Sequence, residues 1–200
     1  AGILVLTGLN TYTGDTTLTN GTIRLGSDDA LGNAVSSYLL VTAGRLSSDG
    51  ATSRSLGNNI TMNGDLSLGS ATNTGRVTLA GGISLEGFNR TFTVDSVATI
   101  SGLLANGAIT KAGASTLTLT AANTYTGGTT INGGVLKLGN EDTSFKFNTG
   151  GLTGSIFFGN LCSLIIYCTH EYSVILIVDD FTSIYTAMLT NSIFFPGVFQ

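Results

Sequence analysis

Two segments of this chain, whose first residues are 113 positions apart (117 − 4), carry nearly the same sequence. Residues 4–26 read LVLTGLNTYTGDTTLTNGTIRLG, and residues 117–139 read LTLTAANTYTGGTTINGGVLKLG. More than half of the aligned positions are identical, including the whole block Asn-Thr-Tyr-Thr-Gly. Repetition of a unit of about 20 to 30 residues is typical of solenoids, in which one supersecondary unit is stacked on the next.

Each copy has the period-2 pattern of half-buried β-strands. Ile23 and Leu25, for example, flank Arg24, so we expect the basic side chain to face water between two inward aliphatic ones. The side chains expected to face inward in the first copy are Leu4, Leu6, Tyr12, Leu18, Ile23 and Leu25. Asn-Gly and Gly-Gly steps between these runs allow corners, because positive φ is accessible there. So few buried side chains cannot offset the entropy of ordering one copy, and neighbouring turns of the chain must stack on it.

The residues between the two copies continue the same pattern. Short strand candidates lie at 38–41, 59–62, 65–68, 76–79, 83–85, 91–94 and 97–100, mostly separated by Gly, Asn, Ser or Asp. There is no proline before Pro196 and no long helical pattern. We therefore predict an all-β fold, a right-handed parallel β-helix (β-solenoid), for residues 1–140; the hand follows from the general preference for right-handed crossovers.

Residues 141–200 have a different composition, and we predict an unrelated or aberrant C-terminal tail. Most of the phenylalanines, both cysteines (Cys162 and Cys168) and the single histidine, His170, come after residue 140. The tail is a cap or second small domain, a membrane-seeking segment with apolar runs too short to span a bilayer, or an out-of-frame translation. The predicted domains are 1–140, with repeats at 3–26 and 111–139, and 141–200.

Charge is sparse and evenly balanced in the first part of the chain. Only 10% of the residues are charged, and residues 1–140 hold equal numbers of basic and acidic side chains. The net charge of −4 therefore arises in the tail, which contains five acidic residues and a single basic one, Lys146. No basic patch is present to suggest nucleic acid as a partner.

The repeated segments carry a family resemblance. The second copy, from Lys111-Ala112-Gly113 through the Asn-Thr-Tyr-Thr-Gly block to Gly139, resembles the autotransporter-associated β-strand repeat. This is the passenger-associated transport repeat of bacterial type V secretion. The first copy, residues 3–26, is similar but has Asp15 where the second has Gly128.

The resemblance implies a surface-exposed or secreted passenger of a Gram-negative bacterium, associated with the outer membrane. Its implied partners are an outer-membrane translocator barrel, which this chain does not include, and a host or neighbouring-cell surface. The chain begins within a repeat and shows no signal peptide, so we expect an internal fragment. We predict a structural and adhesive stalk without enzymatic activity. The alternatives are a carbohydrate-active β-helix enzyme whose catalytic turns lie outside this fragment, and a fragment without independent activity.

The residues singled out are structural members of the repeat. They are Asn10, Tyr12, Gly14, Gly21 and Gly26 in the first copy and Asn123, Tyr125, Gly127, Gly134 and Gly139 in the second. The asparagines are expected to bond backbone groups at a corner. The tyrosines are expected to pack inward or stack at a corner, rather than to serve as platforms for sugars.

No catalytic, cofactor-binding or metal-binding residue is predicted. Asp28-Asp29 is expected to be a solvated turn, and Asp179-Asp180 lies in the atypical tail. His170 has no Gly-x-Ser-x-Gly nucleophile motif to act with. Cys162 and Cys168 either form a small disulfide loop or stay free, and they lack the second pair that a zinc site would need.

Overall fold

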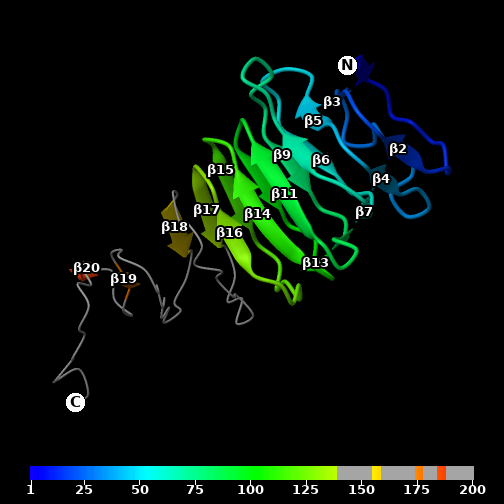
Figure 1. Ribbon diagram of the computed structural model, residues 1–200. Helices are drawn as coiled ribbons and strands as arrows, with labels where there is room; N and C mark the ends of the chain where they lie inside the picture. The colour runs from blue at the N-terminus through cyan, green and yellow to red at the C-terminus, as the bar shows by residue number, and fades with distance from the viewer. Residues whose placement is uncertain (139–154, 159–173, 178–183, 188–200) are drawn as a thin grey trace. The chain divides into compact units, whose positions relative to one another are not determined.

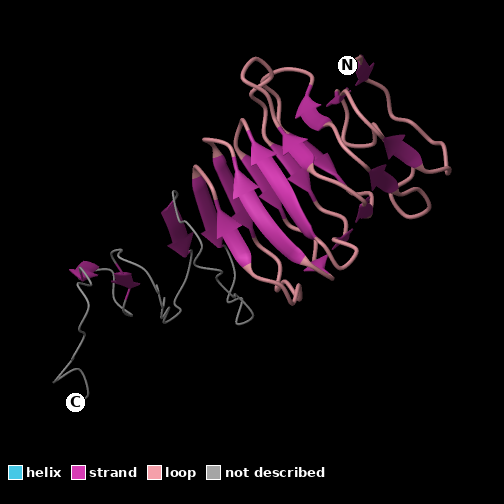
Figure 2. Cartoon of the chain, viewed as in Figure 1, coloured by secondary structure: helices cyan, strands magenta, loops and turns pink. Residues whose placement is uncertain are grey.

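The computed structural model describes residues 1–138, 155–158, 174–177 and 184–187, the last three ranges as backbone only. Contacts divide the chain into two compact units, Ala1–Asn160 and Leu161–Gln200. Within the described residues there is no helix, and every regular element is a strand (Figure 2). The first unit is a stack of parallel strands (Figure 1).

Three parallel sheets, here named A, B and C, form the first unit in the described part of the chain. Sheet A has the order β1 (Ile3–Leu6), β3 (Thr22–Leu25), β5 (Arg45–Ser48), β8 (Leu66–Leu68), β11 (Asn89–Val94), β14 (Ala108–Ala112) and β16 (Thr129–Ile131). Sheet B has β13 (Leu104–Ala105), β10 (Ile83–Ser84), β7 (Ile60–Met62), β4 (Leu39–Val41) and β2 (Thr16–Leu18). Sheet C has β18 (Ser155–Phe158), β17 (Val135–Leu138), β15 (Thr116–Leu119), β12 (Ala98–Ile100), β9 (Val77–Leu79) and β6 (Arg54–Leu56).

The chain visits the sheets in the cyclic order A, C, B, as in β5, β6, β7 and again in β8, β9, β10. We call one such passage a coil. Each coil pairs in parallel with the next, for example Leu4 with Ile23 in sheet A and Ala98 with Leu117 in sheet C. The predicted parallel β-solenoid is therefore confirmed. The ladder of sheet C also continues beyond residue 140, because β18 pairs in parallel with β17.

The core is a set of aliphatic columns that run along the stack. One column in sheet C joins Leu56, Leu79, Ile100, Leu119 and Leu138, all of which are buried. Leu79, Ile100 and Leu119 of this column are each covered by the coil before and the coil after, and this provides the burial that a single coil lacks.

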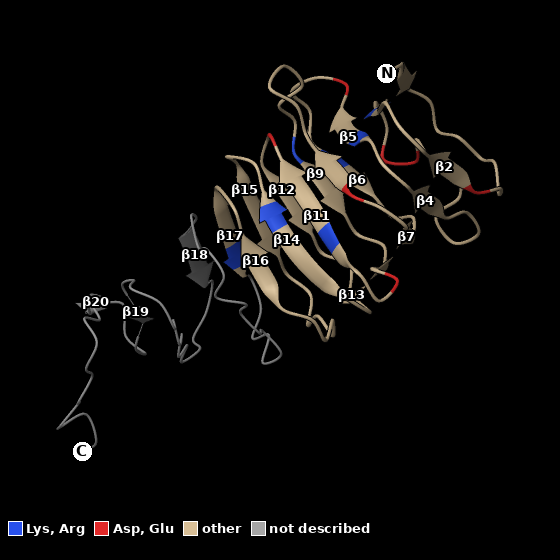
Figure 3. Ribbon diagram, viewed as in Figure 1, with Lys and Arg blue, Asp and Glu red and all other residues tan. Residues whose placement is uncertain are grey.

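The outward positions of the same strands carry hydroxyl side chains. Ser55, Thr78, Thr99 and Thr118 lie in one half-buried column of sheet C and lead to the exposed Lys137. Among the described residues, the positions of Lys and Arg are spread over several strands, and the acidic positions are scattered along the stack (Figure 3). The sequence has few charged residues because Ser and Thr occupy many of the outward positions of its strands.

Two side chains of the first copy are not buried as the pattern predicted. Leu4 is 52% exposed and Tyr12 is 39% exposed, whereas the equivalent Leu117 and Tyr125 in the second copy are buried. The first coil of this chain is covered by a neighbouring coil on one side only, so alternation alone does not bury its side chains. Leu18, Ile23 and Leu25 are buried as predicted, and Leu6 is partly buried against the core.

The second unit contains one described feature. Strands β19 (Val174–Ile177) and β20 (Ile184–Ala187) pair in an antiparallel ladder, with Val174 opposite Ala187. Apart from these strands and β18, residues 141–200 lie outside those that the structure describes, so the cap, membrane-seeking and out-of-frame hypotheses for the tail stay open.

Candidate functional site

The two repeat copies use the same local design on different sheets. The first copy supplies β1 to sheet A, β2 to sheet B and β3 to sheet A. The second supplies β15 to sheet C, β16 to sheet A and β17 to sheet C. In each copy the Asn-Thr-Tyr-Thr-Gly segment takes the place of one strand in the coil, where sheet C would continue in the first copy and sheet B in the second. The copies are therefore rotated by one sheet about the solenoid axis.

The tyrosine of each copy makes the same local hydrogen bond. The hydroxyl of Tyr12 lies 2.8 Å from Oγ1 of Thr16, and that of Tyr125 lies 2.8 Å from Oγ1 of Thr129. This contact joins the segment to the strand that follows it and fixes the direction of the ring. Burial differs because the second segment lies against an earlier coil, where the Thr124 amide donates to the carbonyl of Leu104.

The asparagine of each copy bonds the backbone of a neighbouring coil. Nδ2 of Asn10 donates to the carbonyl of Ala30 at 2.8 Å. Oδ1 of Asn123 accepts from the amide of Leu104 at 2.9 Å, and its Nδ2 donates to the carbonyl of Ala121 at 3.0 Å. Because these segments lack a regular ladder, the side chains satisfy backbone groups that a strand would otherwise pair.

Two equivalent glycines of the repeat need a backbone that other residues rarely adopt. Gly21 has φ of 90° and Gly134 has φ of 67°. A Cβ would lie 2.6 Å from the carbonyl oxygen of Gly2 in the first case and 2.5 Å from that of Gly113 in the second. Both glycines thus combine left-handed φ with close approach of the preceding coil.

The remaining motif glycines differ from one another. A Cβ at Gly14 would meet open space, whereas one at Gly26 or Gly127 would lie 2.9 Å or 2.5 Å from atoms of neighbouring coils. Gly139 lies outside the described residues.

Replacing Gly134 by alanine is expected to destabilise the solenoid by about 1–3 kcal/mol, because the new Cβ meets the preceding coil at a strained φ. The adjacent Gly133 is a matched control, since a Cβ there has no neighbour nearer than 3.5 Å. Gly133→Ala should shift the free energy of unfolding by less than about 1 kcal/mol. Urea unfolding of the two variants tests this expectation, and equal midpoints would contradict it.

A fully buried lysine lies in the core column of sheet A. Lys111 pairs with Phe92 on one side and Ile131 on the other, and its side chain is 0% exposed. Its Nζ donates to the carbonyls of Ala112 at 2.8 Å, Gly113 at 2.8 Å and Gly133 at 3.0 Å. These three carbonyl oxygens take up the three donors of an ammonium group.

The charge of Lys111 is only partly compensated. Burial lowers the pKa of its amine from 10.5 to about 8, although the carboxylate of Asp95 opposes the shift. The lysine was not among the residues singled out from the sequence. A period of two from the inward Ile109 does place Lys111 on the inner side of β14, so the signal was present.

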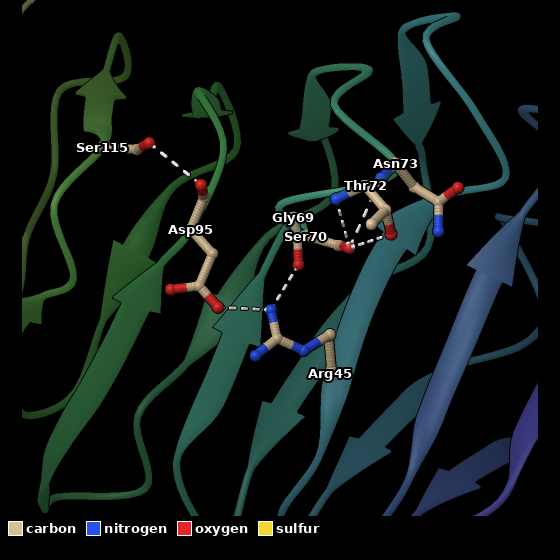
Figure 4. Close-up of polar contacts among 7 residues, drawn as sticks. All are labelled: Arg45, Gly69, Ser70, Thr72, Asn73, Asp95 and Ser115. Atoms are coloured by element: carbon tan, nitrogen blue, oxygen red, sulfur yellow. Dashed lines mark hydrogen bonds and ion pairs between the residues drawn. The ribbon is translucent and has the colours of Figure 1, made fainter.

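A polar cluster on the surface links successive coils (Figure 4). Nη1 of Arg45 lies 2.6 Å from Oδ2 of Asp95 and donates to the carbonyl of Gly69 at 2.5 Å. Oγ of Ser115 donates to the carbonyl of Asp95 at 3.1 Å. The ion pair is about one-third exposed, and such pairs contribute little stability, about 0.2–1 kcal/mol. The cluster holds coils in register and brings no reactive pair of groups together.

Asp28 and Asp29 form part of a turn. Oδ1 of Asp28 accepts from the amide of Ser55 at 2.8 Å, and the carbonyl of Asp29 accepts from the amide of Gly32. Both residues are exposed. Among the residues that the structure describes, no three His, Cys, Asp or Glu side chains gather as metal ligands would.

Comparison with known proteins identifies the repeated segments. The sequence profile of the passenger-associated transport repeat matches residues 1–25 and 109–138. Both segments are passenger-associated transport repeats. The family resemblance predicted from the sequence is thereby confirmed for these two segments, which both lie within the described β-solenoid.

One curated relative extends the comparison. The chain is 40% identical over 80 residues to the adhesin BmaC autotransporter of Brucella suis biovar 1 (strain 1330). The match covers 30% of this chain and 2% of that protein, so the chain spans a very small part of the relative's length. No solved structure matches the chain.

Several residues that were considered as catalytic, metal-binding or disulfide-forming candidates have no described position. Cys162, Cys168, His170, Asp179 and Asp180 lie outside the described residues. Within the described residues, no helix has the length and apolar character needed to cross a membrane.

Proposed function

We propose that this chain is part of the stalk of an autotransporter passenger, displayed on the surface of a Gram-negative bacterium. The stalk supports outer-membrane secretion and carries an adhesive surface. The observation that carries this proposal is the presence of two passenger-associated transport repeats built into one continuous parallel solenoid. The similarity to an autotransporter adhesin points the same way.

A physical reason connects the fold with export. Each coil pairs only with its neighbours, so the solenoid can grow by adding one coil to a folded end. A chain that emerges from an outer-membrane translocator barrel end-first can therefore fold progressively outside the cell. Each added coil buries apolar side chains and opposes backsliding through the barrel.

The test is surface display of the full chain, placed between a secretion signal and an autotransporter translocator in a Gram-negative host. The wild-type chain should reach the surface and resist added protease. Leu117→Asp should abolish display of resistant material, because it places an unpaired charge in the core. Leu4→Asp is the matched control at the equivalent, exposed position of the first copy and should leave display unchanged.

Two outcomes would contradict the proposal. One is a wild-type chain that folds in solution but does not reach the surface. The other is equal display of protease-resistant protein by Leu117→Asp and Leu4→Asp. For the described residues, no observation favours the enzyme alternative over the stalk.

A further inference from the structure

An open hollow of about 590 Å³ lies where the chain passes from sheet B to sheet A. Its walls come from the corners of successive coils, between β10 and β11 and between β13 and β14, and from the end of the second Asn-Thr-Tyr-Thr-Gly segment. The corner between β13 and β14 is beside the label β13 in Figure 1. The passenger repeat itself thus contributes one wall, through Thr126 and Gly127.

The corner between β10 and β11 is longer than its counterpart in the preceding coil. Ile83 pairs with Ile60, and Phe92 pairs with Leu66. Nine positions separate Ile83 from Phe92 (92 − 83), whereas six separate Ile60 from Leu66 (66 − 60). The extra residues form the wall of the hollow. In repeat proteins, insertions of this kind map to loops on one face, which is often the binding face.

The backbone of this corner is strained. Among the described residues, Glu86 (φ 55°) and Asn106 (φ 59°) are the non-glycine residues with positive φ, and both line the hollow. Asn106 precedes Gly107, an Asn-Gly step that suits such a turn. Glu86 occupies the same kind of step before Gly87, although glutamate has no local preference for it. Strained positions of this kind cluster at ligand-binding sites.

The side chains of the hollow combine an exposed aromatic ring with polar groups. Phe88 is 62% exposed, and the guanidinium of Arg90 lies 4.9 Å from the centre of its ring. Oε1 of Glu86 accepts a hydrogen bond from Oγ of Ser84 at 2.7 Å, and Nδ2 of Asn106 lies 3.5 Å from the same hydroxyl. The cation–π contact with Arg90 orients the exposed ring of Phe88, and the hydrogen bond from Ser84 orients the carboxylate of Glu86.

We propose that this corner hollow binds a neutral oligosaccharide. The exposed ring of Phe88 offers an apolar face for the C–H groups of a pyranose, while Glu86 and Asn106 offer an acceptor and a donor to its hydroxyls. The negative charge of Glu86 and the positive charge of Arg90 balance at this corner, so neither a phosphate-rich nor a cationic partner is selected, and a single carboxylate is too few to hold a divalent cation. Successive coils are about 4.8 Å apart, so three corners extend over about 10 Å, the length of a disaccharide.

This site adds a ligand class to the proposed adhesive stalk, but its test does not depend on export. The full chain is titrated in solution with cellohexaose, chitohexaose and maltohexaose, followed by calorimetry. We expect at least one of the three to bind. Phe88→Ala should weaken that binding at least tenfold. Val35→Ala, which removes another highly exposed apolar side chain far from the lining residues in sequence, should leave it unchanged.

A second variant separates binding from folding. Glu86→Asn places a residue that tolerates positive φ at the strained position, so the variant should be at least as stable as the wild type. Its affinity for the oligosaccharide should nevertheless fall at least fivefold, because the carboxylate is lost. Absence of binding by all three oligosaccharides would overturn the inference, and so would wild-type affinity in both Phe88→Ala and Glu86→Asn. Either result leaves the stalk proposal intact, since surface display is measured separately.

Discussion

Replacing Leu117 by alanine is expected to destabilise the solenoid by about 2–5 kcal/mol, the usual effect of truncating a fully buried leucine. Leu117 is 0% exposed on β15 and is covered by Ala98 of the preceding coil and Leu136 of the next. Removing its side chain leaves a cavity between two coils that regular pairing prevents from closing. The change in the free energy of unfolding, measured by urea titration of the full chain, tests this expectation.

The chain contains a matched control for this substitution. Leu4 occupies the same position of the repeat in the first copy, but it is 52% exposed and pairs with Ile23 on one side only. Leu4→Ala should therefore change stability by less than about 0.5 kcal/mol. Similar losses at the two positions would mean that burial depends on the repeat sequence alone, and would contradict the claim that stacked coils create the core.

Most strands of the solenoid could be predicted from the alternation of apolar and polar residues. The strand candidates at 59–62, 76–79 and 97–100 contain β7, β9 and β12, because aliphatic residues two apart flank a threonine in each. Inward aliphatic and outward hydroxyl side chains repeat so regularly that the parallel ladder followed from them. Local sequence was sufficient where aliphatic side chains alternate clearly and both neighbouring coils are present.

Strands with weaker alternation were missed. β5 (Arg45–Ser48) and β6 (Arg54–Leu56) each have a single aliphatic residue, and β14 has the buried Lys111 at an inward position. These strands form because they pair with strands of neighbouring coils, and that pairing cannot be recognised from the local residue pattern. A charged inward residue becomes tolerable only because carbonyl groups of its own coil and the next surround it.

The rotation between the two repeat copies could not be predicted from the sequence. The copies differ by one sheet because the intervening coils vary in length, as shown by the step of 23 residues from Thr22 to Arg45 (45 − 22) and of 19 from Phe92 to Lys111 (111 − 92). Small differences at the corners add up along the chain. The corner hollow could not be predicted either, because its walls come from three separate segments that become neighbours only in the folded solenoid.

The stability of the solenoid is expected to rise between pH 8 and pH 10.5. The pKa of Lys111 is lowered by burial from 10.5 to about 8, despite the opposing Asp95 carboxylate. Below pH 8 the amine is protonated in both the folded and the unfolded chain, and the folded chain bears the cost of a buried charge. Between the two pKa values the unfolded chain holds the proton that the folded chain has released. The free energy of unfolding therefore rises with pH, by at most about 1.4 kcal/mol per pH unit from this one group.

Two lysine variants isolate this contribution from other groups that titrate in the same range. Lys111→Met keeps an unbranched side chain in the column between Phe92 and Ile131 but has no ionisable amine, so its stability should lack the rise. Lys137→Met removes an exposed lysine from β17 and should keep the rise. Urea unfolding at a series of pH values gives the three profiles. A Lys111→Met profile parallel to that of the wild type would show that the amine is charged equally in both states, and that burial in the sheet A column has no effect on its proton.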